Sequence, residues 1–244
     1  MPEGPSIVIL KEEVKQFKGK KVSAASGNSK TFDASILAAE TIIDFKTWGK
    51  HFLICFDKFT IRVHLMLFGS YLINEHKDKP ARLHLQFDDG ELNFYACSLV
   101  LITEPLDEVY DWQADIINPV FNHEKAFEKL KAQPKTLACD ALLDQHIFSG
   151  SGNIIKNEVL FRIKVHPASR LGKIPDEKLH EMIQETVNYS FDFLRWKKAT
   201  VLKKHWLAHT KKTCPRDNVA LQKLYLGKTK RRSYFCIACQ VLYK

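Results

Sequence analysis

The stretch SGSGNIIKNE, at residues 149–158, decides how the second half of the chain folds. Gly150 and Gly152 permit a tight backbone turn, and Asn153 carries the side chain of a helix cap. The first amides of the helix that follows have no partner within that helix, so they form a ready site for a phosphate. An ordinary corner between two helices has the same pattern. The stretch alone therefore predicts the corner and leaves the phosphate site open.

Helical patterns continue on both sides of this corner. Apolar residues recur at helical spacing over residues 122–133, 135–145 and 174–196. The longest of these segments places its apolar side chains on one face, namely Leu179, Met182, Ile183, Val187 and Leu194. We therefore predict a helical domain over residues 122–210.

The first part of the chain has a different pattern. From residue 20 to about residue 105, short β-branched or alternating segments are separated by turn residues such as Asp89-Gly90. One amphipathic helix precedes them. The predicted fold class is α+β and multidomain. An N-terminal β-sandwich with one leading helix over residues 1–118 is followed by the helical domain and by a small β-hairpin finger over residues 211–244.

Positive charge is concentrated at the end of the chain. Residues 195–244 contain fourteen Lys or Arg and one acid, Asp217, whereas the preceding residues contain 23 basic and 27 acidic side chains. A strongly basic segment indicates a polyanionic partner, and DNA or RNA is the first expectation. Aromatic residues are interleaved with these charges, which favours a folded module over a solvated basic tail.

Composition also bounds the class of protein. No apolar run approaches the roughly 20 residues of a membrane span, and SIVIL, at residues 6–10, is too short for the core of a signal peptide. Cys55, Cys97 and Cys139 stand singly in apolar surroundings, so a disulfide framework is not expected. We expect an intracellular protein in the cytoplasm, with no membrane partner.

Three further cysteines cluster near the end of the chain. Cys214 and the pair Cys236-x-x-Cys239 fit three ligands of a zinc ribbon. Asp217 stands where a fourth cysteine belongs, and zinc accepts a carboxylate oxygen; His209 is another candidate ligand. The alternative is a finger that has lost its metal and is held by aromatic packing.

The segment GKTKRRSYF runs between the two ends of this finger. If the ends close a hairpin, Arg231 and Arg232 lie near its tip. An arginine there can bind a phosphate through two hydrogen bonds or enter a groove. A solvated run of charges is the alternative.

The opening MPEGPS raises a chemical possibility. If Met1 is removed, Pro2 becomes a secondary amine, and the α-amino reference pKa of about 8 leaves a nucleophilic neutral fraction near neutral pH. Glu3 would lie beside this amine. A frayed terminus without a role is the alternative.

Two further places in the β-domain can serve DNA. Lys50, in TWGKHF, and His64, in HLMLFG, lie at strand ends, where single residues of these types are most often structural or solvated. Met66, Leu67 and Phe68 either belong to the core or are pushed into a duplex to hold open the gap left by an extruded base.

Taken in this order, the stretches resemble the formamidopyrimidine-DNA glycosylase and endonuclease VIII family of base-excision repair enzymes. MPEGP resembles the family's start, SGSGNIIKNEVLF its helix-two-turn-helix segment, and GKTKRRSYFCIACQ its C-terminal finger. The likeness runs from Pro2 to Gln240. Nothing between the long helix and Cys214 resembles the glycine-rich loop with which the formamidopyrimidine branch covers oxidised purines, so the chain is more similar to the endonuclease VIII branch.

The resemblance implies a bifunctional DNA glycosylase and AP lyase that acts as a monomer on damaged double-stranded DNA, with zinc in the finger and no organic cofactor. Pro2 would attack C1′ of the damaged nucleotide and form a Schiff base, from which β,δ-elimination cleaves the strand. Glu3 would act as general acid. Oxidised pyrimidines are the implied lesions. The alternatives are an 8-oxoguanine or formamidopyrimidine glycosylase and a non-catalytic protein that binds damaged DNA.

The resemblance also assigns the remaining positions. Those that would contact phosphate are Lys50, beside the reacting sugar, and His64, Asn153 and Arg231, with Arg232 as the out-of-register alternative. Glu158 would face the reacting centre, and residues 66–68 would form the base-stack wedge. Two positions depart from the family: Ser6 stands where an acid is usual, and Asp217 stands where a cysteine ligand is usual.

Overall fold

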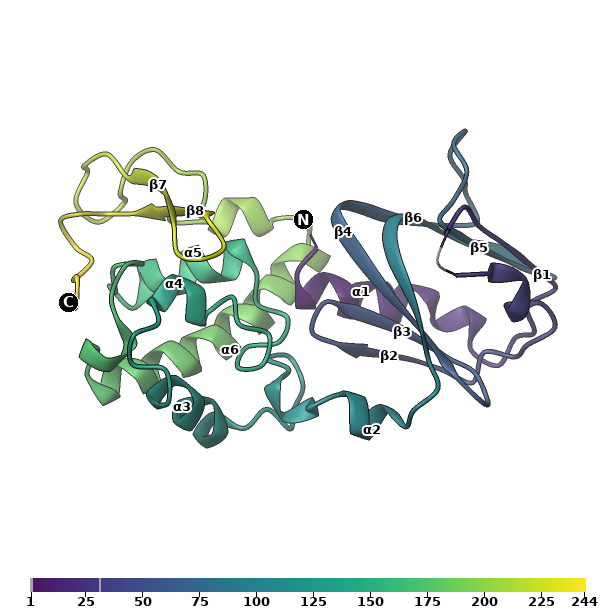
Figure 1. Ribbon diagram of the computed structural model, residues 1–244. Coiled ribbons are helices and arrows are strands. Elements are labelled where there is room, and N and C mark those ends of the chain that lie inside the picture. The colour runs from purple at the N-terminus through teal and green to yellow at the C-terminus, as the bar shows by residue number, and fades with distance from the viewer. Residues whose placement is uncertain (1, 31) are drawn as a thin grey trace. The chain divides into compact units, whose positions relative to one another are not determined.

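The structure is a computed structural model that describes residues 2–30 and 32–244. The chain divides into two compact units, one ending at Tyr110 and the other beginning at Asp111. The predicted α+β class is confirmed, with a sheet in the first unit and helices followed by a hairpin in the second (Figure 1). The finer division at residues 118, 122 and 211 stays a prediction. Among the described residues, no helix is both long and apolar enough to span a membrane.

A six-stranded antiparallel sheet forms the first unit, in the order β1-β5-β6-β4-β3-β2 (Figure 1). The strands are β1 (Ala24–Ser26), β2 (Asp44–Trp48), β3 (His51–Cys55), β4 (Thr60–Ile73), β5 (Leu83–Phe87) and β6 (Gly90–Ile102). The long strands β4 and β6 pair with each other and connect the half that contains β2 and β3 to the half that contains β1 and β5. The two halves of the predicted sandwich are therefore joined in one continuous ladder.

One core lies between the two halves and the leading helix. Helix α1 (Gly4–Glu13) and the 3-10 turn η1 (Val14–Phe17) bury their apolar face against the sheet. The rings of Phe17 and Phe87 stack with centroids 4.5 Å apart. Alternation along a strand sends neighbouring side chains to opposite faces, so the residues between those of the core on β3 and β4 point away from it. His51, Arg62 and His64 share that outer face.

The second unit contains most of the helices. They are α3 (His123–Lys131), α4 (Ala138–Ala141), α5 (Asn153–Arg162) and α6 (Asp176–Lys198), with the 3-10 turns η3 (Trp112–Ala114), η4 (Leu171–Lys173) and η5 (Leu202–His205). The remaining short elements, η2 (Ala34–Leu37) and α2 (Leu106–Val109), belong to the first unit. Helix α5 packs against α6, and the two share a second apolar core.

The helix predicted over residues 135–145 is only the single turn α4. The carboxylate of Asp144 accepts a hydrogen bond from the backbone N–H of His146 at 2.9 Å, and this local bond competes with a further helical turn. Gln145 then holds the loop that follows, because its side chain bonds to the backbone of both Leu143 and Gly150. The helix ends at Ala141, and the side chains of Asp144 and Gln145 then hold a loop that is not helical.

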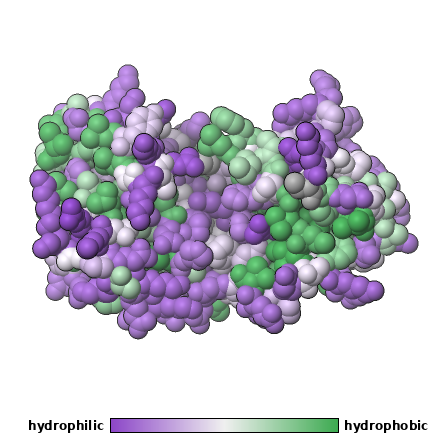
Figure 2. All heavy atoms as spheres, viewed as in Figure 1, coloured by the Kyte–Doolittle hydropathy of each residue, from purple (hydrophilic) through white to green (hydrophobic). Residues whose placement is uncertain are grey.

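The finger is a two-stranded hairpin of β7 (Gln222–Leu226) and β8 (Arg231–Phe235). Strand β8 packs on α5 (Figure 1). Hydrophilic side chains cover most of the face shown in Figure 2, and apolar side chains gather there over the sheet of the first unit. Val100 and Leu101, on β6, are among the exposed apolar residues of this sheet.

Candidate functional site

Glu3 is a buried carboxylate at the start of α1. It occupies the N-cap position with extended backbone, and its side chain is completely removed from solvent. The residues after it favour a helix start, because Pro5 lies in the first turn, where its missing N–H costs nothing. The partial positive charge of a helix N-terminus stabilises a carboxylate at this place. Pro2, which is half-buried, immediately precedes it.

Lys50 lies in the two-residue turn between β2 and β3. Trp48 and His51 are paired across this turn, and Gly49 between them has φ 53°. A glycine with positive φ at the first central position is typical of the hairpin turn whose twist matches the flanking strands. The backbone therefore presents Lys50 at a fixed corner of the sheet.

Two histidines face each other next to this corner. His51 and His64 are paired across β3 and β4, with ring centroids 5.2 Å apart. Burial lowers the pKa of His51 to about 3, helped by the charge of Arg62. Burial also lowers the pKa of His64, and Lys50 and Arg62 add to that effect. Both rings are therefore neutral near pH 7, and the positive charge of this edge comes from Lys50 and Arg62.

His51, Arg62 and Tyr110 also contribute to this corner and were not predicted from the sequence. The Tyr110 hydroxyl lies 3.3 Å from His51 Nδ1, and its ring is 5.0 Å from that of Trp48. The alternation of IRVHL places Arg62 on the same face as His64, and this signal was available in the sequence. The contact between Tyr110 and His51 could not be predicted from the sequence, because Tyr110 lies in another segment of the chain.

Met66, Leu67 and Phe68 lie where β4 loses its register with β6. The register shifts between Leu65 and Ser70, and Phe68 is 84% exposed there, with Met66 and Leu67 about half exposed. A Cβ on Gly69 would lie 2.8 Å from the Leu65 Cα and from the Met66 N, so only glycine permits this bulge. These side chains are not core residues.

The N-terminus of α5 differs in one detail from the expectation. Gly152 is the N-cap, with extended backbone, and Asn153 is the first helical residue. Asn153 is nearly buried, and its Oδ1 atom has no hydrogen-bond partner among the described residues. Gly150, with φ 97°, makes the turn that the sequence predicted. Gly152 has no side chain, so the cap residue itself makes no side-chain hydrogen bond to the first amides of the helix.

Glu158 is fully buried on the same helix. Its carboxylate accepts hydrogen bonds from the backbone N–H groups of Leu207 (2.9 Å), Ala208 (2.9 Å) and His209 (2.7 Å). These bonds fix the segment after η5 onto α5. The expected position of Glu158 facing a reacting centre stays a prediction, and the contacts within this unit are those of a structural anchor.

The finger is attached to the helices at several points. Lys228, in the hairpin tip, donates its backbone N–H to the Asp140 carboxylate at 3.0 and 3.1 Å. Gly227, with φ 74°, makes room, because a Cβ there would lie 2.2 Å from Asp140 Oδ1. At the base, the Gln240 amide donates to the carbonyls of Leu160 (3.2 Å) and Val165 (2.8 Å). The tip and the base are thus held independently.

The two arginines of β8 differ in their partners. Arg232 Nε donates to the Tyr225 hydroxyl at 2.9 Å, and its guanidinium lies over that ring. Arg231 is exposed at the first position of β8, and among the described residues its side chain has no hydrogen bond or ion pair. The choice between Arg231 and Arg232 as the arginine that contacts a ligand stays a prediction.

Three cysteines and one aspartate gather at the base of the finger. One ligand atom from each of Cys214, Asp217, Cys236 and Cys239 lies within 4.8 Å of the others. Asp217 Oδ2 accepts from the thiols of Cys214 (3.3 Å) and Cys236 (3.2 Å). Three thiolates and one carboxylate form a donor set that zinc accepts in tetrahedral geometry.

His209 lies outside this cluster. Its Nδ1 is 3.2 Å from the Asn157 amide nitrogen, and its ring packs against Trp206 and Tyr234. Burial lowers its pKa to about 4. Of the two candidates for the fourth ligand, Asp217 is the one that the fold brings to the cysteines.

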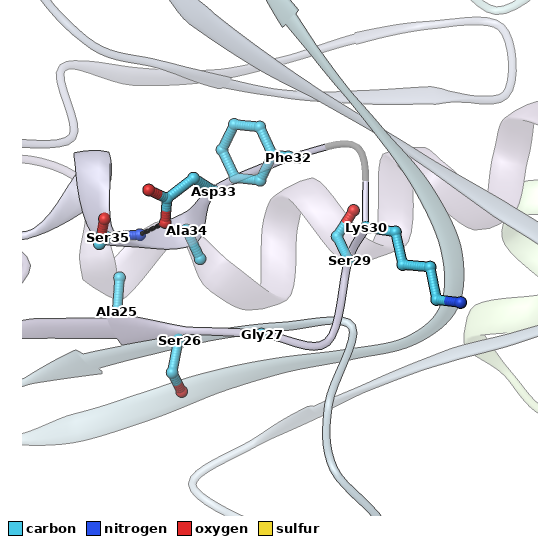
Figure 3. A pocket seen from close by; sticks show the side chains of 9 residues that line it. All are labelled: Ala25, Ser26, Gly27, Ser29, Lys30, Phe32, Asp33, Ala34 and Ser35. Atoms are coloured by element: carbon cyan, nitrogen blue, oxygen red, sulfur yellow. Dashed lines mark hydrogen bonds between the residues drawn. The ribbon is translucent and has the colours of Figure 1, made fainter.

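A pocket of about 600 Å³ in the first unit contains none of the predicted residues. Figure 3 shows its lining, which comes from β1, the loop after it and η2. The Asp33 carboxylate caps η2 by accepting from the Ser35 N–H at 2.9 Å. The Asp33 carboxylate in this pocket thus serves the local fold.

Two family models match most of the chain. Residues 1–97 match the formamidopyrimidine-DNA glycosylase N-terminal domain, and residues 114–201 match the H2TH domain of the same enzyme. Endonuclease 8-like 3 of Bos taurus is 30% identical over 204 residues, covering 80% of this chain and 34% of the relative. Endonuclease 8-like 2 of Mus musculus is 31% identical over 196 residues, covering 74% of this chain and 57% of the relative. The chain thus spans about a third of the length of the endonuclease 8-like 3 relatives.

Solved structures show the same fold. Formamidopyrimidine-DNA glycosylase of Lactococcus lactis, bound to DNA with an AP site, superimposes with a TM-score of 0.86 at 21% identity, over 98% of this chain and 99% of the other. A viral DNA glycosylase superimposes with a TM-score of 0.83 at 21% identity, over 98% and 100%. With both family models in order along one chain and this fold, the protein belongs to the formamidopyrimidine-DNA glycosylase and endonuclease VIII family.

Proposed function

We propose that this protein is a DNA glycosylase of base-excision repair with AP lyase activity, in which Pro2 is the nucleophile and Glu3 the general acid. The observation that carries the proposal is the buried carboxylate of Glu3 directly after Pro2, at the N-terminus of α1. A binding protein needs neither group. Residue 1 lies outside the described residues, and its removal is part of the proposal.

The chemistry needs only these groups and a base that can depart. The Pro2 nitrogen forms a bond to C1′, the glycosidic bond breaks, and the base leaves with the bonding electrons and a proton supplied through Glu3. The Pro2 nitrogen gives up its proton, the C1′–O4′ bond breaks, and O4′ takes up a proton. The resulting iminium ion between Pro2 and C1′ makes the C2′ proton labile. Loss of that proton expels the 3′ phosphate, and a second elimination expels the 5′ phosphate. Water then releases Pro2.

The other candidate residues have roles in holding the DNA. Lys50, His64, Asn153 and Arg231 would contact phosphates, with a neutral His64 acting as a hydrogen-bond partner and Lys50 supplying charge. Phe68 and its neighbours, exposed on the bulge of β4, would fill the gap left by the extruded base. The basic finger would supply sequence-independent, salt-sensitive affinity.

We propose oxidised pyrimidines as substrates. The names of the curated relatives support this choice, since they are endonuclease 8-like proteins, and the Lactococcus lactis enzyme has been solved with DNA that contains an oxidised pyrimidine. A mutant of that enzyme has been solved with Fapy-dG DNA, so an 8-oxoguanine or formamidopyrimidine glycosylase is the second candidate function. Excision from duplexes with thymine glycol, dihydrouracil or 8-oxoguanine opposite cytosine separates them. Preference for 8-oxoguanine would overturn the pyrimidine assignment.

The decisive experiment is borohydride trapping with a duplex that contains one abasic site. A covalent adduct mapped to Pro2 is the expected result. A matched control carries two additional residues before Pro2, which removes the free amine and should abolish the adduct while binding persists. Absence of an adduct from the unextended protein, with DNA still bound, would leave the non-catalytic binding protein as the function.

We also propose that zinc is bound by Cys214, Asp217, Cys236 and Cys239. The ion would cross-link the base of the finger and take no part in the reaction. Metal analysis of protein purified without added zinc is expected to give one equivalent, with loss in Asp217→Ala and retention in Asp217→Cys. Less than about a tenth of an equivalent would contradict the site, since a closed structural zinc site holds its metal tightly.

A further inference from the structure

Lys156 is a buried lysine on α5 to which no role has been assigned. Its side chain is 1% exposed. The Nζ atom donates to the backbone carbonyl of Arg232 at 3.0 Å and to the Ser233 hydroxyl at 2.9 Å. Burying an ammonium group is costly unless hydrogen bonds compensate it, and these two bonds connect α5 to the start of β8.

Its position on the helix suggests what that role is. Asn153, Lys156 and Asn157 are spaced three and four residues apart, so they share one face of α5. The Asn157 amide donates to the Asn153 carbonyl at 2.8 Å and to the Arg232 carbonyl at 3.2 Å. Its Oδ1 accepts from the Tyr234 N–H at 3.0 Å. One short stretch of α5 thus connects the start of the helix to the first residues of β8.

The Arg232 carbonyl is the point where these bonds converge. It receives donors from both Lys156 and Asn157, and it belongs to the peptide unit between Arg232 and Ser233, one residue beyond Arg231. The exposed Arg231 side chain therefore starts from a backbone that is fixed relative to Asn153. A group that is held in place before binding loses less conformational entropy when a ligand arrives.

We propose that Lys156 is a positioning residue for DNA. It sets the spacing between the two phosphate-contact groups of the second unit, Asn153 and Arg231, and it adds a fixed positive charge to the surface that they form. This inference rests on the proposed DNA-binding function. A charge in the interior acts through a lower effective dielectric than one in water, so a buried ammonium is felt by a bound phosphate more strongly than an exposed one.

The test compares three variants. Lys156→Met keeps the length of the side chain and removes its charge, whereas Lys156→Arg keeps the charge. Lys135→Met removes a charge from an exposed lysine of the same unit. Affinity for a duplex with a tetrahydrofuran abasic analogue is measured from about 50 to 200 mM salt, a range over which phosphate contacts dominate. We expect Lys156→Met to lose about tenfold in affinity and to show a shallower salt slope. Lys135→Met should bind within about twofold of the wild type, as expected for a lost surface charge.

A second measurement separates positioning from general stability. Arg231→Ala is introduced into the wild type and into Lys156→Met, and its cost in affinity is compared. If Lys156 positions Arg231, the Arg231→Ala substitution should cost several-fold less in the Lys156→Met background, because the two losses overlap. Additive losses would overturn the inference, and so would a Lys156→Met protein that binds as tightly and as salt-dependently as Lys135→Met.

Two safeguards keep the result decisive. If Lys156→Met does not fold, Ser233→Ala is used, because it removes one acceptor of the Lys156 ammonium and keeps the charge. This variant is expected to lose a few-fold in DNA affinity without a change in salt slope. Unchanged affinity would overturn the inference. Failure of the proposed function is seen separately, because a wild type that does not bind the abasic duplex defeats that function before any variant is compared.

Discussion

The two units hold their candidate groups in different ways. In the first unit, local backbone features present each group: Glu3 lies at a helix start, Lys50 in a two-residue turn and Phe68 on a bulge. In the second unit, the polar residues of α5 are buried and bonded to segments far away in the sequence. The Glu158 carboxylate binds amides 49 to 51 residues further along the chain. Substitutions of these groups in the first unit should therefore change the chemistry and spare the fold, whereas loss of the Glu158 carboxylate on α5 should mainly lower stability.

The largest effect is expected at the start of the chain. Pro2→Gly should keep DNA binding and lose most activity. Glu3→Gln should lower base excision by about 10²–10⁴-fold, the usual contribution of a general acid, and cleavage of a ready-made abasic site by less. Single-turnover rates on the two substrates measure the difference. Equal losses on both would contradict Glu3 as the acid for base departure.

Next in size is the effect of Glu158→Ala on stability. It leaves three backbone N–H groups, one buried and two part-buried, without their charged acceptor, and hydrogen bonds to charged groups contribute about 1.5–3 kcal/mol each. We expect the free energy of unfolding of the second unit to fall by about 3–5 kcal/mol. Denaturant titration measures it, with Glu128→Gln on the exposed face of α3 as control. A loss no greater than that of the control would mean that the 207–209 segment is not held by this carboxylate.

A smaller and purely functional effect is expected for Phe68→Ala. Its side chain is 84% exposed, so the free energy of unfolding should change by less than about 0.5 kcal/mol. Excision from a duplex should fall about tenfold, because filling the gap of an extruded base offsets an unstacking cost of a few kcal/mol. A lesion in single-stranded DNA serves as the control and should be processed nearly as before. The assignment of Phe68 to the base-stack wedge is contradicted if Phe68→Ala shifts the midpoint of unfolding and leaves the rate of excision from duplex DNA unchanged.

The smallest expected effect is a loss of folding stability as the pH falls, and it should appear in both units. Burial lowers the pKa of His51 to about 3 and that of His209 to about 4, whereas an unfolded histidine titrates near about 6.5. The unfolded chain therefore takes up more protons below that pH. The stability contributed by each neutral ring is present above about pH 6.5 and is lost as the pH falls toward the folded pKa, by about 1 kcal/mol per pH unit for each ring.

His51→Phe and His209→Phe should each flatten this dependence between pH 6.5 and pH 5, where most carboxylates are still ionised. Denaturant unfolding at several pH values measures the slope for each unit. A slope that is unchanged in His51→Phe would mean that its ring is protonated in the folded protein.

Parts of the site could be predicted from the sequence because they depend on local chemistry. Pro2 beside Glu3, the glycine turn at Gly150, and the cluster of Cys214, Cys236 and Cys239 need only residue type and spacing. Other parts could not be predicted. Asn153 is not the cap because Gly152 already has the extended backbone of that position, and beyond the short helix α4 the Asp144 side chain bonds the backbone of His146 in place of a further helical turn. Such competition is decided by geometry that no spacing reveals.

By itself, the sequence determined the order of the elements, the α+β class and the family, because apolar periodicity and short motifs survive without knowledge of contacts. Only the tertiary structure decided which of two adjacent arginines bonds to Tyr225, that Asp217 and not His209 joins the cysteines, and that Lys156 is buried beneath the finger. The physical reason is distance along the chain. The Lys156 ammonium and the carbonyl that it binds are 76 residues apart, and only the packing of β8 on α5 brings them together.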